Sequence, residues 1–166
     1  IRSFFARTAG VRTTEATDEA SLIRALDDLG AVPDLLVNNA GIMPLSPLVD
    51  QSDASIDKVL DINLRGVITG TQLAARAMSA RGHGHVVNVA SLAGKVPLRG
   101  LAVYNASKFA VVGLTAATRL EMESSGVSVT AVLPSAVRTE LSSGIDLGVL
   151  PTVDPEDIAR AVVGSV

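Results

Sequence analysis

Short apolar runs alternate along this chain with long segments of helical periodicity, and this alternation limits the folds open to it. Buried strands are predicted for three runs rich in valine and leucine, at 35–37, 85–90 and 127–133. Long helices are predicted for 52–80, with a bend near Asn63, and for 103–125. Strands and helices that alternate in this way pair in parallel through right-handed crossovers. We therefore expect an α/β fold with a doubly wound parallel sheet.

The two ends of the chain carry weaker signals. Residues 11–15 are expected to form a further strand, and a helix is expected from Pro155 to Val166 behind Asp154, a residue type that commonly caps helices. The segment 141–153 is rich in glycine and serine, which is typical of a flexible substrate loop. Because no repeat or linker interrupts the sequence, residues 1–166 are expected to form one domain.

Composition excludes several classes of protein. Hydrophobic residues make up 48% of the chain and aromatic residues only 2%, so the core must be aliphatic, as in parallel sheets covered by helices. The net charge of -3 comes without a basic stripe, which argues against a nucleic-acid partner. No apolar stretch approaches the about 20 residues that cross a bilayer, and the first residues lack a signal peptide. Together with the absence of cysteine, these features favour a cytoplasmic protein without a membrane partner.

Clusters of small and polar residues follow each of the three predicted strands. These clusters are Asn38 to Gly41, Ser91, and Pro134 to Thr139. In open parallel sheets, ligands bind outside the carboxyl ends of the strands, near the point where the strand order reverses. The sequence therefore predicts a ligand site at this edge of the sheet.

Tyr104 and Lys108 lie four residues apart on a predicted helix, so their side chains leave the same face one turn apart. A tyrosine hydroxyl ordinarily has a pKa near about 10, and a neighbouring ammonium group lowers that pKa by favouring the phenolate. Ser91 could donate to a carbonyl oxygen that gains negative charge during a reaction. Asn63 competes for backbone groups inside a helix, so it can bend the helix and hold a water molecule. Taken alone, a Tyr-x-x-x-Lys pair arises often by chance, and the spacing of all these residues together carries the interpretation.

Five motifs make the combined pattern specific: Asn-Asn-Ala-Gly at 38–41, Asn63 within Asp-Ile-Asn-Leu-Arg-Gly, Ser91, Tyr-Asn-Ala-Ser-Lys at 104–108, and Pro-Ser-Ala-Val-Arg-Thr at 134–139. In these motifs and their spacing the chain resembles the short-chain dehydrogenase/reductase family from about Glu15 onward. The resemblance implies a Rossmann-like fold, NAD or NADP as cofactor, and a small-molecule alcohol or carbonyl compound as substrate. Members of the family commonly form homodimers or homotetramers through their long helices.

The resemblance also assigns roles to single residues. Tyr104 would transfer the proton, Ser91 would orient the substrate oxygen, Lys108 would lower the Tyr104 pKa and bind the nicotinamide ribose, and Asn63 would hold a water of the proton relay. Cofactor contacts are implied for Asn38, Ala40, Gly41, Tyr104, Lys108, Pro134, Val137 and Thr139, and no metal is implied.

The sequence departs from the family pattern in three respects. The family begins with a strand and a glycine-rich turn whose amides bind the pyrophosphate, and these 166 residues contain no such turn. The family's last strand is also missing, so we expect a Rossmann-type domain that is incomplete at both ends. Because the residue that distinguishes NAD from NADP belongs to the missing part, the choice between them stays open. Ser135 stands where the family usually has glycine, at a modest expected cost.

Other interpretations remain at this stage. A catalytically silent or truncated relative that serves in association only is the main alternative, and a flavodoxin-like binding module is a weaker one. His83 and His85 could suggest a metal site, although an exposed turn before a strand fits them better. Five apolar residues, together with the segment 141–150, could line a substrate pocket or belong to the core: Met43, Leu45, Leu92, Val96 and Leu98.

Overall fold

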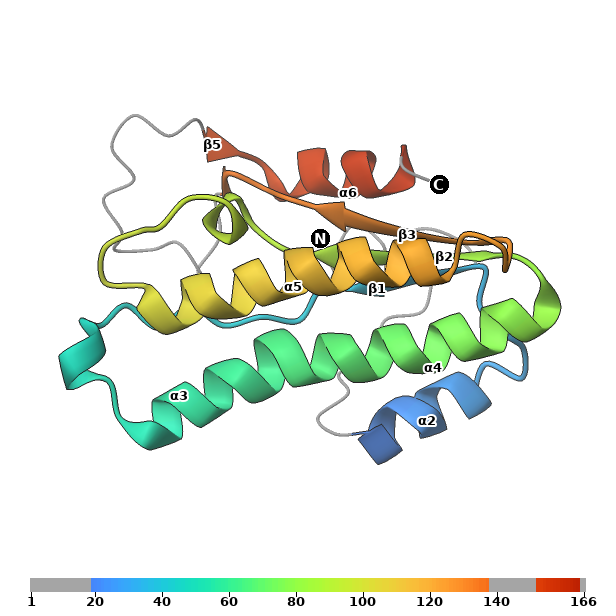
Figure 1. Cartoon of the computed structure of the whole chain (residues 1–166), viewed down its shortest axis with the longest axis horizontal. Coiled ribbons are helices and arrows are strands. Elements are labelled where there is room, and N and C mark those ends of the chain that lie inside the picture. Colours follow the sequence, from blue (N-terminus) through green and yellow to red (C-terminus); the bar gives the residue numbers. More distant parts are fainter. Residues whose placement is uncertain (1–18, 138–151, 165–166) are drawn as a thin grey trace.

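The computed structural model describes residues 19–137 and 152–164, and its centre is a parallel sheet of three strands (Figure 1). The strands, in their spatial order, are β1 (Leu35–Asn38), β2 (Gly84–Val89) and β3 (Val127–Val132). Leu36 pairs with Val86, and Val86 pairs with Val129. The α/β class and the parallel pairing are confirmed. The predicted strand at 11–15 and most of the predicted loop, 141–151, lie outside the described residues.

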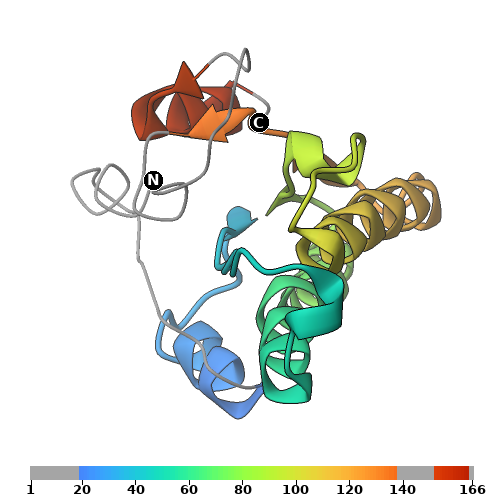
Figure 2. The ribbon, with the colours of Figure 1, turned by 90° about the vertical axis from the view of Figure 1, so that its left-hand side faces the viewer.

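Helices cover both faces of this sheet (Figures 1 and 2). One face carries α4 (Gly66–Arg81), with α2 (Glu19–Asp27) packed against α4, and α5 (Ala102–Glu121). The other face carries α6 (Pro155–Val163), whose Ala159 and Val162 pack with Val87. Neighbouring residues of a strand point to opposite faces of the sheet, so Val86 packs against α4 whereas Val87 packs against α6. The doubly wound arrangement is therefore confirmed.

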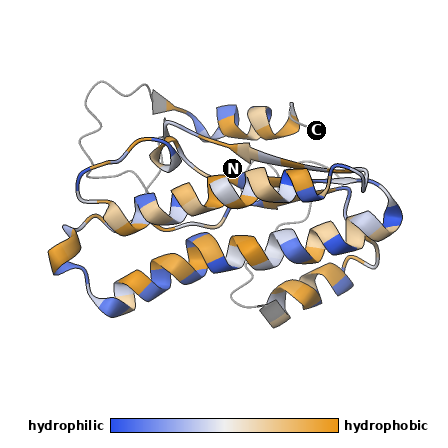
Figure 3. Cartoon of the chain, viewed as in Figure 1, coloured by the Kyte–Doolittle hydropathy of each residue, from blue (hydrophilic) through white to orange (hydrophobic). Residues whose placement is uncertain are grey.

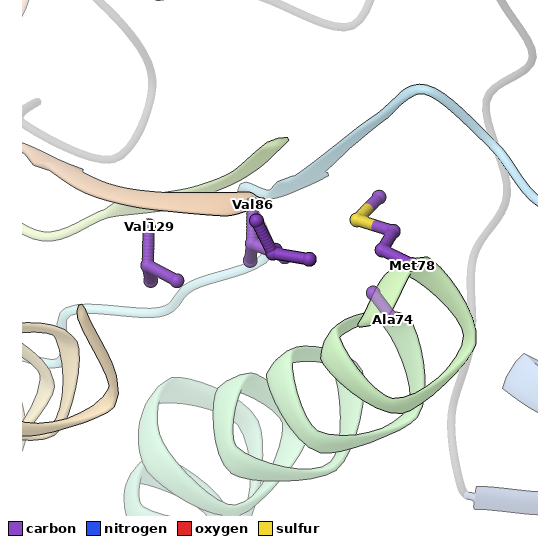
Figure 4. Close-up of a cluster of buried hydrophobic side chains, with 5 residues drawn as sticks. Ala74, Met78, Val86 and Val129 are labelled. Atoms are coloured by element: carbon purple, nitrogen blue, oxygen red, sulfur yellow. The ribbon is translucent and has the colours of Figure 1, made fainter. Parts of the chain in front are cut away.

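The core between α4 and the sheet is aliphatic, as the composition predicts. Figure 4 shows Ala74 and Met78 of α4 pointing toward Val86 and Val129 of the sheet. Met78 and Val86 are completely buried. Figure 3 shows hydrophobic residues recurring along the helices, whereas hydrophilic residues gather at turns such as the one from α4 into β2. None of the helices within residues 19–137 and 152–164 is long and apolar enough to cross a membrane.

The predicted helix at 52–80 is a continuous rod with an irregular turn near its middle. It consists of α3 (Asp53–Leu60), a π-helical turn η2 (Asp61–Arg65) and α4. The Ser52 side chain accepts a hydrogen bond from the Ser55 amide, so Ser52 caps the rod rather than belonging to it. The irregularity predicted near Asn63 coincides with this π turn, a feature often found at functional sites.

The second long helix is shorter than predicted. It begins at Ala102 and ends at Glu121 rather than at Ser125. The Ser125 hydroxyl donates to the Met122 carbonyl and accepts from the Val127 amide, so it closes a turn that competes with further helix. In this turn Gly126 has a φ of 74°, and a Cβ there would lie 2.1 Å from the Gly82 carbonyl oxygen. Only glycine permits this close approach, which brings the starts of β2 and β3 together.

The C-terminal helix begins as predicted. Asp154 and Asp157 form a reciprocal capping box around Pro155, and α6 ends at Val163. Residues Thr152–Val153, which the sequence places in the flexible loop, form the short strand β5, which pairs in parallel with β4 (Ala136–Val137).

The two histidines have different surroundings. His83 is exposed, as expected, and lies 4.0 Å from Asp34. The expectation of an exposed turn is wrong for His85, which is buried in β2 with its Nε2 2.8 Å from the Thr130 hydroxyl oxygen. The alternation of the strand turns His85 onto the sheet face, where β3 supplies a polar partner. The described part of the chain contains no group of three or more potential metal ligands of the His, Cys, Asp and Glu types.

Candidate active site

The carboxyl ends of the three strands meet at one edge of the sheet, and the predicted clusters follow them. Ser91 comes two residues after β2 and Pro134 two residues after β3. The Leu92 amide donates to the Pro134 carbonyl at 2.8 Å, which joins the two segments. A Cβ on Gly41, after β1, would lie 3.7 Å from the Lys108 ammonium nitrogen. The structure therefore brings Gly41, Ser91, Lys108 and Pro134 to the same edge.

Tyr104 and Lys108 lie on the first turns of α5 and are both buried. The two residues are 6% and 4% exposed. The Lys108 Nζ lies 5.7 Å from the centre of the Tyr104 ring and donates to the Val89 carbonyl oxygen at 3.0 Å. This arrangement fixes the ammonium group between the end of β2 and the phenol ring, as the helical spacing predicts.

Ser91 connects the end of β2 to the phenol. Its backbone is extended and its side chain caps the short 3₁₀ helix η3 (Leu92–Gly94), accepting a hydrogen bond from the Ala93 amide at 3.1 Å. The same side chain contributes a hydrogen-bonding interaction that lowers the pKa of Tyr104. Ser91 and Tyr104 are therefore close enough to act on one substrate oxygen.

The protonation of this pair differs in part from the expectation. Burial raises the pKa of Tyr104, and the hydrogen bond with Ser91 only partly offsets that rise. Burial therefore outweighs the lowering that the neighbouring ammonium group was expected to produce. Burial lowers the pKa of Lys108 itself to about 8. At neutral pH the site thus holds a neutral phenol beside an ammonium group.

Asn63 lies in the π turn and is completely buried. Its Oδ1 accepts from the Ile42 amide and its Nδ2 donates to the Ile42 carbonyl, both at 2.8 Å. The same Nδ2 also donates to the Ser107 hydroxyl at 3.3 Å. Asn63 therefore binds the segment after β1 to α5, and its role in holding a water stays a prediction.

Asn38 has a structural role in addition to its predicted place near the cofactor. Its Nδ2 donates to Asn88 Oδ1 at 2.8 Å and to the Thr71 hydroxyl at 3.2 Å. Asn88 in turn donates to the Thr115 hydroxyl at 3.0 Å. This buried network joins β1, β2, α4 and α5 directly beneath the strand-end edge.

The structure gives less detail for the other residues that were predicted to contact the cofactor. Ala40 is exposed just after β1, and Pro134 is buried with its carbonyl bonded to Leu92. Val137 belongs to β4, and Thr139 lies outside the described residues. Ser135 adds an observation that fits a bound ligand, because its Oγ is buried and finds no hydrogen-bond partner among residues 19–137 and 152–164.

The sequence interpretation missed the role of several buried polar residues. Asn105, Asn88, Thr71, Thr115 and Ser107 are all buried and hydrogen-bonded around the site. Their signal in the sequence is weak but real, since each is a polar residue within a predicted strand or helix that is otherwise largely apolar.

Five apolar residues could be assigned from the sequence either to a substrate pocket or to the core, and two of them lie beside the Tyr104 ring. Met43 and Leu98 are partly buried and pack against the cluster of Ala93, Leu101 and Tyr104. Leu45 and Val96 are half exposed, at 55% and 47%. The Ser46 amide donates to the Gly100 carbonyl at 2.9 Å, so the segments that carry these residues lie side by side.

Comparison with known proteins supports the resemblance to short-chain dehydrogenases. The short chain dehydrogenase family profile matches residues 2–148. An uncharacterized oxidoreductase of Staphylococcus haemolyticus is 32% identical over 151 residues, which are 91% of this chain and 65% of that protein. The 3-alpha-(or 20-beta)-hydroxysteroid dehydrogenase of Mycobacterium tuberculosis is 36% identical over 133 residues, which are 78% of this chain and 46% of that protein. The chain thus spans between about half and two thirds of these relatives.

Solved structures resemble the chain closely. A 4-hydroxyisoleucine dehydrogenase complexed with NADH is 27% identical with a TM-score of 0.78, and the match covers 92% of this chain and 70% of that one. A gluconate 5-dehydrogenase from Burkholderia cenocepacia in complex with NADP and tartrate is 27% identical with a TM-score of 0.79, and the match covers 87% of this chain and 61% of that one.

Proposed function

Because the chain belongs to the short-chain dehydrogenase family, we propose that it interconverts an alcohol and a carbonyl compound by hydride transfer, with Tyr104 as the acid and base. The observation that carries this proposal is the buried group of Ser91, Tyr104 and Lys108 at the carboxyl ends of the strands. The substrate is a small-molecule alcohol or carbonyl compound.

Tyr104 handles the proton. In the reducing direction its hydroxyl hydrogen passes to the substrate oxygen while the carbonyl carbon receives the hydride, which leaves an alcohol and a phenolate. Burial raises the pKa of Tyr104, so at neutral pH the hydroxyl carries the proton that it has to give. The Ser91 hydroxyl donates to the same oxygen and stabilises the negative charge that grows there.

Lys108 supplies the positive charge. Its buried ammonium group lies over the Tyr104 ring and stabilises the phenolate once the proton has left. One of its hydrogens is bonded to Val89, and the others remain for a ribose hydroxyl. Asn63 holds Ile42, and with it the segment that follows β1, against this group.

The proposed cofactor is NAD or NADP, whose nicotinamide ring supplies or accepts the hydride when bound. Two structural neighbours contain NADH and NADP, which supports a nicotinamide nucleotide without choosing between the two. The residues that would hold the cofactor lie near the carboxyl ends of the strands. They are Ala40, Gly41, Lys108 of α5, Pro134 and Ser135.

The test is a titration with NADH and NADPH followed by nicotinamide fluorescence, and then a carbonyl-reduction assay on a panel of small ketones. Tyr104→Phe is expected to keep nucleotide binding and to lose activity by about a hundredfold or more, the range that general acid catalysis contributes. Ser124→Ala is the control, because it removes an exposed hydroxyl from the turn at the far end of α5. Full activity in Tyr104→Phe would overturn the role of Tyr104, whereas a parent protein that reduces none of the ketones would favour a catalytically silent relative.

We also propose a homodimer through α4 and α5. Their outer faces enclose a groove of about 340 Å³. Exposed Ile68 and Phe109 lie on the same two helices, and the groove contains both Arg76 and Glu121. In a twofold dimer each copy presents the same patch, so Arg76 of one copy can face Glu121 of the other. Sedimentation should show a dimer for the parent and a monomer for Phe109→Glu, and a parent that is monomeric at all concentrations contradicts the interface.

A further inference from the structure

Asn105, the residue after Tyr104, is bound entirely to one loop. It is 7% exposed, and its Nδ2 donates to the Ala93 carbonyl at 2.7 Å and to the Val96 carbonyl at 2.9 Å. Its Oδ1 accepts from the Leu98 amide at 3.0 Å. One amide side chain on the first turn of α5 thus holds three backbone groups of the segment 93–98.

The same segment approaches α5 at a second point. A Cβ on Gly94 would lie 2.7 Å from the Lys108 carbonyl oxygen and 2.9 Å from a methyl group of Val112. The loop therefore rests on the helix backbone one turn beyond Asn105. Its start is also fixed from the other side, because the Leu92 amide donates to the Pro134 carbonyl.

The Ala93 peptide connects Asn105 with Ser91. Its carbonyl accepts from Asn105, and the Ala93 amide donates to the Ser91 hydroxyl oxygen at 3.1 Å. Because Ser91 Oγ accepts this bond, its hydroxyl hydrogen is left to point elsewhere. Asn105 thereby acts on the orientation of Ser91 through the Ala93 peptide, although no hydrogen bond joins the two side chains directly.

We propose that Asn105 is a positioning residue that holds the Ser91 hydroxyl against Tyr104 by clamping the Ala93 peptide to the start of α5. The proposal rests on the proposed function, in which Ser91 and Tyr104 act on one oxygen. Asn105 touches neither substrate nor cofactor in this scheme, and it acts through Ser91.

The surroundings of Tyr104 allow a change in the position of Ser91 to be measured as a change in the Tyr104 pKa. The elements packed against its ring contribute Ala93, Leu98, Met43 and Leu101, which are all apolar. The charged group that faces the ring is Lys108 of the same helix. The hydrogen bond with Ser91 lowers the Tyr104 pKa against the effect of burial, so weakening that bond must raise the pKa.

The experiment is an alkaline titration of Tyr104 by phenolate absorbance, which needs neither turnover nor cofactor. The chain contains one tyrosine and no tryptophan, and the difference spectrum against Tyr104→Phe isolates the signal. Asn105→Ala and Ser91→Ala are each expected to raise the Tyr104 pKa. The double variant is expected to match Ser91→Ala alone, because Asn105 acts through Ser91.

Thr115→Val is the matched control. It removes a buried hydrogen bond between α5 and Asn88 at 3.0 Å, away from the clamped loop. It should lower the melting temperature and leave the Tyr104 titration at its parent position. A Tyr104 pKa that is unchanged in Asn105→Ala, or that rises equally in Thr115→Val, overturns the proposal.

A milder variant covers the case in which Asn105→Ala does not fold. Asn105→Ser keeps a polar group that is too short to reach Ala93 and Leu98 together, and it should raise the Tyr104 pKa in the same direction. In carbonyl-reduction assays both variants should lower kcat by about tenfold with little change in KM, as expected for a small misplacement of reacting groups. Failure of the proposed function appears separately, as full activity in Tyr104→Phe.

Discussion

Gly70→Ala tests the buried polar network beneath the site. Gly70 lies inside α4, and a Cβ there would meet Asn38 Oδ1 at 2.3 Å and its Cγ at 3.1 Å. The distance of 2.3 Å is shorter than any real Cβ contact, so the Asn38 side chain has to move. When it moves, it loses its bonds to Asn88 at 2.8 Å and to Thr71 at 3.2 Å.

The magnitude follows from three contributions. Each lost hydrogen bond costs about 1 kcal/mol. Crowding of a packed interior costs about 1 to 3 kcal/mol. Replacing a helical glycine by alanine returns about 1 kcal/mol. We therefore expect Gly70→Ala to lower the free energy of unfolding by about 2 to 4 kcal/mol.

Denaturant titration followed by circular dichroism measures this loss. Gly66→Ala is the control on the same helix, because its Cβ would lie 3.5 Å from the Asp61 carbonyl, an ordinary contact, and it should stabilise the protein slightly. In an Asn38→Ala background the cost of Gly70→Ala should shrink, since the clashing oxygen is gone. An equal cost in both backgrounds would refute the assignment of the clash to Asn38.

Two further predictions concern Lys108 and Ser135. Burial lowers the pKa of Lys108 from 10.5 to about 8, so between these pH values the unfolded chain binds more protons and stability rises with pH. At neutral pH the parent should be less stable to unfolding than Lys108→Met by roughly 3 kcal/mol. This difference in the free energy of unfolding should narrow as the pH rises from about 8 to 10.5. A difference that does not depend on pH would show that the buried ammonium group is not its cause. Ser135→Ala removes a buried hydroxyl without a partner, so it should raise the free energy of unfolding by about 1 kcal/mol in thermal melts. No gain beyond that of the exposed Ser124→Ala would show that the Ser135 hydroxyl finds a partner in solution.

The regular elements were predictable because each rests on local patterns. Helical periodicity predicted a helix over 52–80, which the structure shows from Asp53 to Arg81, and the bend predicted near the poor helix former Asn63 coincides with the π turn. The shorter end of α5 was not predicted, because it depends on a hydroxyl of Ser125 that bonds to two backbone groups at once. The sequence contained two conflicting indications for His85, a buried strand over 85–90 and an exposed turn with His83, and local patterns could not decide between them because its partner Thr130 lies 45 residues away on another strand.

The placement of several candidate residues at one edge of the sheet could be predicted from the sequence, whereas the pKa values of Tyr104 and Lys108 could not. Helical spacing places Tyr104 and Lys108 on one face, and strand ends place Ser91 and Pro134 at one edge. A lowered Tyr104 pKa was expected and a raised one is found, because tertiary packing decides how deeply the phenol is buried and where the Lys108 ammonium group lies.

What the sequence determined by itself is the set of elements and the spacing of the reactive groups along them, because periodicity, capping and turn formation act between near neighbours. The folded structure alone decided which buried polar groups meet. The pairs Asn38 with Asn88 and Asn105 with Ala93 are 50 and 12 residues apart, and they form only once the sheet and helices have set their register. A buried polar group requires a partner but does not specify which one, so the choice is made by packing.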